Sequence, residues 1–354
     1  MTEREKAEDE RPIRRAVEVS DAAVPAKKRG IVGQLVLLAI TAIGFYVVWP
    51  SLLETFSAWP DLLEVRPVWF VLMFGLELAS FVSFWYLLRL VLHTTEWFGI
   101  ATSQVAGNAF SRIVPGGAVA GAALQMRMLV SAGFDPTRCA SALTAASLLT
   151  TATVFAMPVL ALPAIIGGAP AREGLAQAAW IGVGVSVVLV AIGAMLLLTD
   201  APLRKFGRGI QRVRNLFRKD HPEPEALEAS LIEERRFLLR QLGSRWWEAL
   251  LSSVGKWTFD YLALLAGLAA VGAHPRPSLV LLAFVGASVL SMIPITPGGL
   301  GFVEAGLTGL LTLAGVPAGA ATLATLAYRL FSYWLPILAG LVAAQLHARR
   351  YGAI

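Results

Sequence analysis

The feature that most constrains this chain is a series of apolar runs, each about as long as a membrane is thick. A helix rises 1.5 Å per residue, so about 20 apolar residues cross a hydrocarbon layer of about 30 Å. Six runs approach or exceed that length: residues 31–48, 68–92, 140–166, 175–198, 246–271 and 318–346. Hydrophobic residues make up 56% of the chain and charged residues 15%, a balance that favours a bilayer over a soluble core. We therefore predict an all-α, polytopic integral membrane protein with about six full spans.

Lysine and arginine are distributed unevenly among the segments that connect these runs. Residues 1–30 contain eight and residues 199–245 contain eleven, whereas the three loops on the other side carry one each: Arg66, Arg172 and Arg276. Segments rich in Lys and Arg stay in the cytoplasm. We therefore expect a multi-pass protein of the cell (inner) membrane with its N-terminus and C-terminus in the cytoplasm. The same bias accounts for the net charge of +6, so no nucleic acid partner is expected.

The chain divides by composition into two tails and one membrane domain. Residues 1–30 mix charges of both signs and lack the apolar core of a signal peptide, which predicts a disordered cytoplasmic tail. Residues 31–346 form the predicted transmembrane domain, and residues 347–354 a short cytoplasmic tail. In the cytoplasmic loop 199–245, leucines share one helical face between residues 224 and 242. This amphipathic helix lies either on the membrane surface or against a cytoplasmic partner.

Few residues are available for a metal or a cofactor. Cys139 is the only cysteine, which excludes an intrachain disulfide and a thiolate metal cluster. The four histidines fall in loops or near span ends, where we expect a solvated set: His93, His221, His274 and His347. The chain carries no nucleotide-binding P-loop. We predict no metal site and no cofactor.

Two further apolar stretches, residues 100–130 and 279–314, are interrupted by the same tripeptide. Residues 279–293 would form a helix of roughly 22 Å, too short to cross the bilayer. A Pro-Gly-Gly turn follows, and a second short apolar arm begins after it. Proline removes a backbone donor and glycine permits a sharp reversal. The sequence therefore predicts two helical hairpins with Pro115-Gly116-Gly117 and Pro297-Gly298-Gly299 at their tips.

The predicted topology starts the first hairpin from the cytoplasm and the second from outside. Such an inverted repeat is typical of transporters whose substrate site lies near the midplane between broken helices. A half-helix that begins after each tip would direct its free N–H groups and positive dipole end into the membrane, where they suit a phosphate or carboxylate. The alternative is a structural kink, with Gly117 and Gly121 allowing close helix approach. Whether each hairpin re-enters or crosses twice stays open.

Six ionisable residues fall where lipid is expected. An ionised side chain at the bilayer centre costs about 2.5–3.5 kcal/mol on insertion scales, so such residues usually face a partner or a water-filled cavity. They are Glu77, Arg112, Arg127, Asp260, Glu304 and Arg329. We predict a Glu304–Arg329 ion pair if the second hairpin packs on the last span. Arg89 and Lys256 lie nearer span ends, where snorkelling is expected.

We assign these residues to two roles. Arg112 and Arg127 have no acidic neighbour in the sequence, which favours phosphate binding. Glu77 and Asp260 would tune the charge of the site or carry protons. The predicted substrate-binding set is Arg112, Pro115, Gly116, Gly117, Gln125, Arg127, Pro297, Gly298, Gly299, Glu304, Tyr328 and Arg329.

Several motifs of the chain resemble a known family. They are SRIVPGG at residues 111–117, IPITPGGLGFVEA at 293–305, YRL at 328–330, YWLP at 333–336, and Gly340. This pattern is similar to the lysylphosphatidylglycerol synthase transmembrane-region family, of flippase-like or UPF0104 type, from about residue 30 to residue 346. The resemblance implies roughly eight hydrophobic segments and a role in moving lipids or lipid-linked headgroups between leaflets. The soluble aminoacyl-transferring domain of bifunctional members has no counterpart before Ile354, so we expect no synthase activity from this chain.

The leading hypothesis is a lipid flippase-like transporter whose partners are membrane lipids with an anionic headgroup. The headgroup would enter a polar cavity between the two hairpins while the lipid chains stay in the bilayer. One alternative is a membrane-embedded lipid or glycan transferase, although the sequence shows no interfacial Asp or His cluster for it. Another is a scaffold whose helix at 224–242 recruits a separate lipid-modifying enzyme. Self-association into a homo-oligomer also stays open.

Overall fold

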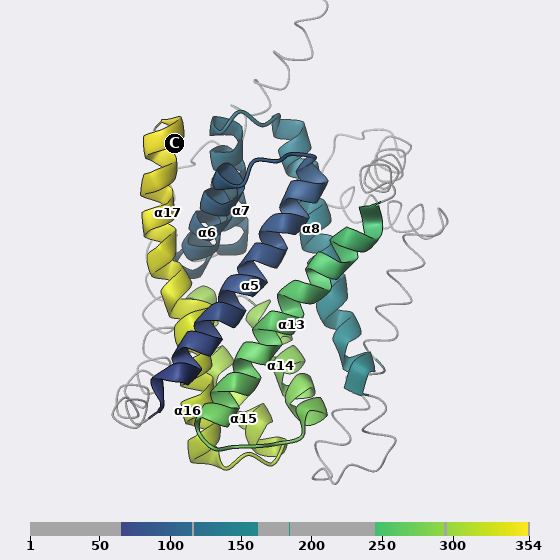
Figure 1. Ribbon diagram of the computed structural model, residues 1–354, viewed down its shortest axis with the longest axis vertical. Helices are drawn as coiled ribbons and strands as arrows, with labels where there is room; N and C mark the ends of the chain where they lie inside the picture. Colours follow the sequence, from purple (N-terminus) through teal and green to yellow (C-terminus); the bar gives the residue numbers. More distant parts are fainter. Residues whose placement is uncertain (1–64, 115–116, 162–183, 185–244, 294–295, 353–354) are drawn as a thin grey trace, which may run out of the picture. The chain divides into compact units, whose positions relative to one another are not determined.

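The computed structural model describes residues 65–114, 117–161, 184, 245–293 and 296–352, all within one compact unit that spans residues 48–354. Every regular element in these residues is a helix, which confirms the predicted class for this part of the chain (Figure 1). Three helical stretches are long and apolar enough to cross a membrane: Pro67–Val91, Pro136–Leu160 and Ala318–Tyr351. They correspond to three of the six predicted spans.

The other predicted spans have different outcomes. Residues 246–271 form helix α13, Trp246–Ala270, which carries Glu248, Lys256 and Asp260 and is not among the three apolar stretches. The spans predicted at 31–48 and 175–198 lie outside the described residues. The same holds for the tail at 1–30 and the amphipathic helix at 224–242.

Helices α5, Pro67–Leu92, and α13 pack side by side along most of their lengths (Figure 1). Small residues line their interface, where Gly255 faces the Ser83 side chain. Ser80 Oγ donates a hydrogen bond of 2.9 Å to the Lys256 carbonyl. This close pairing brings the charged residues of α13 against α5.

The first predicted hairpin consists of α6, Phe98–Ile113, and α7, Gly117–Ser131. Its two arms approach closely because glycines face each other. A Cβ added to Gly121 would meet the carbonyl oxygen of Gly107, and a Cβ added to Gly107 would lie 2.8 Å from the carbonyl oxygen of Gly121. Close helix approach is thus one use of the small residues that the sequence places here.

The second predicted hairpin consists of α14, Pro277–Ser291, a 3-10 turn η3, Pro297–Gly299, and α15, Phe302–Leu313. Gly298, Gly299 and Gly301 all adopt positive φ, at 61°, 73° and 76°. Residues with a Cβ rarely tolerate this conformation, which explains the glycine-rich tip. Helix α15 begins at Phe302 and not directly after Gly299, so the predicted start of this half-helix was wrong by two residues.

The last predicted span is a broken helix. Helix α16, Ala318–Arg329, passes through a π-helical turn η4, Leu330–Trp334, into α17, Leu335–Tyr351. Within this turn the Leu335 N–H donates to the Leu330 carbonyl, five residues back. Pro336 has no N–H, so the carbonyl four residues before it, that of Ser332, loses its helical donor. This break was not among the features predicted from the sequence.

The two hairpins enter from opposite ends and meet at their tips. Hairpin α6–α7 lies at the end where α17 finishes, and hairpin α14–α15 lies at the other end (Figure 1). A Cβ added to Gly298 would meet the Tyr333 hydroxyl and lie 2.9 Å from the Arg112 carbonyl oxygen. The turn of the second hairpin therefore lies against the C-terminal end of α6.

Two separate apolar clusters hold the hairpins. One joins the second hairpin to α13 and α16 and includes Leu264, Phe284 and Leu307. The other joins the first hairpin to α5 and to α8, Pro136–Ala156, and includes Leu88 and Leu129. A short 3-10 helix η1, Met157–Ala161, continues α8 into the first of these clusters.

We predict that Gly340→Ala lowers the apparent melting temperature by several degrees, although alanine favours a helix by about 1 kcal/mol over glycine. A Cβ at Gly340 would meet Ala109 Cβ and lie 2.9 Å from the Val105 carbonyl, which forces α17 away from α6. Thermal unfolding of the purified protein in detergent, followed by tryptophan fluorescence, measures the change.

Gly309→Ala is the matched control, because a Cβ there meets nothing within 4 Å. Its melting temperature should equal or exceed that of the wild type. If both variants are equally stable, α17 does not pack on the first hairpin as described.

Candidate functional site

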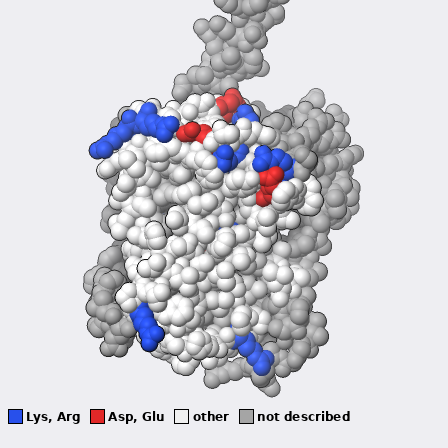
Figure 2. Space-filling model, viewed as in Figure 1, with Lys and Arg blue, Asp and Glu red and all other residues white. Residues whose placement is uncertain are grey.

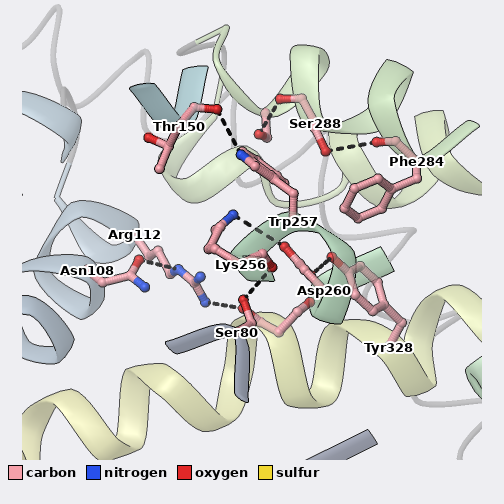
Figure 3. Close-up of polar contacts among 12 residues, drawn as sticks. Ser80, Asn108, Arg112, Thr150, Lys256, Trp257, Asp260, Phe284, Ser288 and Tyr328 are labelled. Carbon is pink, nitrogen blue, oxygen red and sulfur yellow. Dashed lines mark hydrogen bonds and ion pairs between the residues drawn. The ribbon is translucent and has the colours of Figure 1, made fainter. Parts of the chain in front are cut away.

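Polar side chains from six elements converge where the hairpin tips meet. We call this set the central polar cluster: Glu77 of α5, Arg112 of α6, Lys256 and Asp260 of α13, Glu304 of α15, Tyr328 and Arg329 of α16, and Ser332 and Tyr333 of η4. Figure 3 shows Arg112, Lys256, Asp260 and Tyr328 turned toward one another. Outside this set, charged side chains on the visible face gather near the two ends, and the band between is almost free of them (Figure 2).

Arg112 fastens the first hairpin to the π turn. Its Nη1 donates to the carbonyl oxygens of Ser332 and Tyr333, both at 2.7 Å. Its Nε donates to Asn108 Oδ1 at 3.1 Å, one turn back on α6. The Ser332 carbonyl is free to accept because Pro336 supplies no helical donor. Among the described residues, no carboxylate lies within ion-pair distance of this guanidinium.

The ring of Tyr333 contacts two cations. The guanidinium carbon of Arg112 lies 4.9 Å from the ring centroid, and that of Arg329 lies 4.2 Å from it. The Tyr333 side chain is only 2% exposed, so water does not weaken these cation–π contacts. The aromatic ring thus allows two positive charges to lie near each other in an apolar surrounding.

The predicted ion pair between Glu304 and Arg329 is confirmed. Arg329 Nε donates to Glu304 Oε1 at 2.7 Å, and both side chains are largely buried. Glu304 lies in the first turn of α15, near the positive end of the helix dipole. The pair is not saturated, because Glu304 Oε2, Arg329 Nη2 and the neighbouring Ser332 Oγ are buried without a hydrogen-bond partner among the described residues. Buried polar atoms are normally paired, so these three atoms keep unused hydrogen-bonding capacity.

The second group of the cluster is acidic. Asp260 accepts a hydrogen bond of 2.6 Å from the Tyr328 hydroxyl and lies 3.5 Å from Lys256 Nζ (Figure 3). Glu77, 5% exposed, interacts with Asp260 across the α5–α13 interface. Its Oε1 has no hydrogen-bond partner among the residues that the structure covers. Both acids therefore belong to the same cluster as the arginines.

Lys256 does not snorkel to a span end, as the sequence analysis had expected. It lies in the middle of α13, with Nζ 3.1 Å from the centroid of the Trp257 ring and in contact with Asp260. The aromatic face and the carboxylate stabilise the charge inside the helix bundle. The expectation was wrong because it considered only the position of Lys256 along the chain. Asp260, one helical turn away, provides a partner that keeps the Lys256 side chain inside the bundle.

The remaining predicted binding residues are scattered. Gly298 and Gly299 form the second tip beside the cluster, and Pro297 begins that turn. Gly117 begins α7, whereas Pro115 and Gly116 lie outside the described residues.

Two predicted residues of α7 are not brought into the central polar cluster. Gln125 packs against Gly107 between the hairpin arms, and its Nε2 has no partner there. Arg127 is exposed. Their assigned role in substrate binding stays a prediction, and the geometry gives it no support.

Sequence reasoning missed four residues of the site. Asn108 and Ser332 carried no charge to mark them, and Lys256 was assigned to the lipid boundary. Tyr333 was part of a quoted motif but received no role. The signal that could have found the π turn is Pro336, because a proline inside a predicted span frees the carbonyl four residues before it.

His347 corrects the expectation of four solvated histidines. It is fully buried, with Nδ1 2.7 Å from Thr102 Oγ1, and Nε2 2.9 Å from the Met128 carbonyl and 3.1 Å from Ser131 Oγ. The ring therefore joins α17 to both arms of the first hairpin. Within the described residues, no group of three His, Cys, Asp or Glu side chains could hold a metal ion.

Comparison with known proteins places this architecture among membrane proteins. The family model described as "Lysylphosphatidylglycerol synthase TM region" matches residues 32–340. A UPF0104 membrane protein of Methanothermobacter thermautotrophicus is 34% identical over 98 residues, 28% of each chain. A second UPF0104 membrane protein of that organism is 26% identical over 167 residues, 45% of this chain and 49% of the relative. These matches thus span half the length of the relatives or less.

We predict strong coupling between Glu304 and Arg329 in a double-mutant cycle. Glu304→Gln or Arg329→Gln alone leaves a buried charge unpaired and should lower the apparent melting temperature markedly, whereas the double variant should lose less than the sum of the two. The pair of the exposed Arg245 with Glu248, at 2.7 Å, is the control and should show weaker coupling, because solvent screens it. Additive losses at the buried pair would show that these charges do not interact.

Proposed function

The chain belongs to the lysylphosphatidylglycerol synthase TM region family, and from this premise we propose that it is a flippase-like transporter. It moves the anionic headgroup of a phospholipid or lipid-linked substrate between membrane leaflets. The observation that carries the proposal is the contact of the Tyr333 ring with both Arg112 and Arg329, beside buried donors that have no hydrogen-bond partner among the described residues.

A phosphate group fits the unsatisfied atoms of this site. Arg329 Nη2 and Ser332 Oγ are donors that lack an acceptor, and a phosphodiester offers oxygen acceptors with a negative charge. Hydrogen bonds between a guanidinium and phosphate are charge-assisted and therefore strong. A headgroup that leaves water loses its hydrogen bonds to water. Donors of the protein must replace these bonds, because an unpaired charge in the hydrocarbon layer is costly.

The arrangement of the hairpins supports an alternating pathway. They start from opposite ends of the described unit and meet at the cluster, as expected for an inverted repeat with a midplane site (Figure 1). Arg349 and Arg350 mark one end and Arg276 the other. By the positive-inside bias, the end with Arg349 and Arg350 lies on the cytoplasmic side of the cell membrane, and the end with Arg276 lies on the outer side.

The lipid chains would remain in the bilayer throughout. Helices α5 and α17 present large apolar side chains at their surfaces, among them Val71, Leu72, Leu338 and Leu341. These surfaces match hydrocarbon, so only the headgroup requires shielding during transfer. A polar site enclosed by apolar helices therefore suits a substrate with one polar end.

We expect Ser332→Ala to slow lipid movement roughly tenfold, since a hydrogen bond to a charged group contributes about 1.5–3 kcal/mol. Ser332 Oγ has no hydrogen bond that meets geometric criteria among the described residues, and Tyr328 is its polar neighbour. The assay uses phosphatidylcholine vesicles that contain the purified protein and a trace of fluorescent phosphatidylglycerol. Bleaching of the outer leaflet by dithionite reports the rate of movement.

Ser147→Ala, an exposed serine on α8, is the matched control and should move lipid at the wild-type rate. Vesicles without protein give the background. Wild-type vesicles that equal this background would remove the proposed function. A normal rate for Ser332→Ala would show that the headgroup does not bind at the π turn.

A further inference from the structure

The three carboxyl groups of the central polar cluster have unequal partners. Glu304 forms an ion pair of 2.7 Å with Arg329, and Asp260 lies 3.5 Å from Lys256 Nζ and accepts the Tyr328 hydroxyl. Glu77 has no cation within ion-pair distance among the described residues, and its Oε1 has no hydrogen-bond partner. Glu77 is thus the acid whose negative charge the protein compensates least.

The neighbour that Glu77 does have is another acid. Ser83 faces Gly255 and Ser80 donates to the Lys256 carbonyl, so α5 and α13 run antiparallel here. Glu77, one turn before Ser80, therefore faces Asp260, one turn after Lys256. Two carboxyl groups that face each other can share one proton. The other ionisable groups that face the pair are Lys256 of α13, Tyr328 of α16 and Arg112 of α6. The pair is therefore a place where one proton can be held inside the helix bundle.

The charges of the cluster show when that proton is needed. Among the described residues the cluster has three cations, Arg112, Lys256 and Arg329, and three acids. With every group ionised the empty site is neutral. A phosphodiester adds one negative charge, and one proton on the acidic pair restores neutrality. A site with only the headgroup or only the proton carries a net charge, which the apolar surrounding disfavours.

We propose that Glu77 and Asp260 take up one proton together with the anionic headgroup and release both on the other side, so that the lipid and the proton are transported together. The proposal rests on the proposed function and adds its energy source. A carboxylate oxygen of the pair forms an O–H bond with a proton from water on the loading side. The same bond breaks to water on the release side, so that charge and protons balance.

Such coupling makes the transported unit electrically neutral. The headgroup carries one negative charge and the proton one positive charge, so a membrane potential exerts no net force on the pair. A pH difference does act, because each pH unit changes the free energy of one proton by the equivalent of a tenfold ratio. The lipid should therefore accumulate in the leaflet on the alkaline side.

The wild-type protein tests this directly in phosphatidylcholine vesicles with a trace of fluorescent phosphatidylglycerol. A difference of one pH unit should enrich the fluorescent lipid up to about tenfold in the leaflet facing the alkaline side. A potassium diffusion potential, imposed with valinomycin at equal pH, should leave the distribution unchanged. Vesicles without protein correct for spontaneous movement.

Glu77→Gln removes the proton site but keeps the size and the hydrogen-bonding capacity of the side chain. The headgroup then moves alone as an anion, so the variant should respond to the membrane potential and not to the pH difference. Glu96→Gln is the matched control. Glu96 accepts a hydrogen bond from Tyr351 at the end of α17, outside the cluster, and its variant should behave as the wild type.

Three outcomes decide between the proposals. A wild-type response to pH and not to potential supports coupling, even if Glu77→Gln does not fold. Wild-type movement that ignores the pH difference or follows the potential overturns coupling and leaves the transporter intact. No movement by the wild type above the protein-free background removes both proposals.

Discussion

The contact of Arg112 with the π turn is the interaction on which the rest of the site depends. Pro336 leaves the Ser332 carbonyl without a helical donor, and Arg112 donates to it and to the Tyr333 carbonyl at 2.7 Å. This joins the first hairpin to the last helix and places the Tyr333 ring beside both guanidiniums. Gly298 then packs against the Tyr333 hydroxyl, which brings the second hairpin to the same point.

Small residues and two apolar clusters position the contact between Arg112 and the π turn. Gly107, Gly121 and Gly340 let α6, α7 and α17 approach closely, because any Cβ there would meet the neighbouring helix. Each hairpin is fixed by its own cluster of buried side chains, and the central polar cluster gathers residues from both hairpins and the helices around them. Charge inside an apolar bundle is costly unless it is compensated. Mutual compensation of arginines, lysine and acids is therefore what permits the site.

The sequence predicted the parts of this design that leave a local signal. Apolar runs gave three of the spans, and the Pro-Gly-Gly tripeptides gave both hairpins with the tip of the second. The Glu304–Arg329 pair followed because each charge needed a partner in an apolar segment. What failed depended on distant contacts. Lys256 and His347 looked peripheral from their positions in the sequence. Asp260 and Trp257 in fact hold Lys256 inside the bundle. His347 is held by Thr102, Ser131 and Met128.

We propose that the two hairpins enter the membrane from opposite faces and meet inside it. The most direct measurement is labelling by an impermeant thiol reagent of single cysteines at the outer ends of the hairpins, with buried Cys139 replaced by serine. Thr137→Cys, in the exposed first turn of α8 after the first hairpin, should react only from the cytoplasmic side. Ala318→Cys, exposed after the second hairpin, should react only from outside. Labelling of both from one face would contradict the account, because the tips could not then meet within the bilayer.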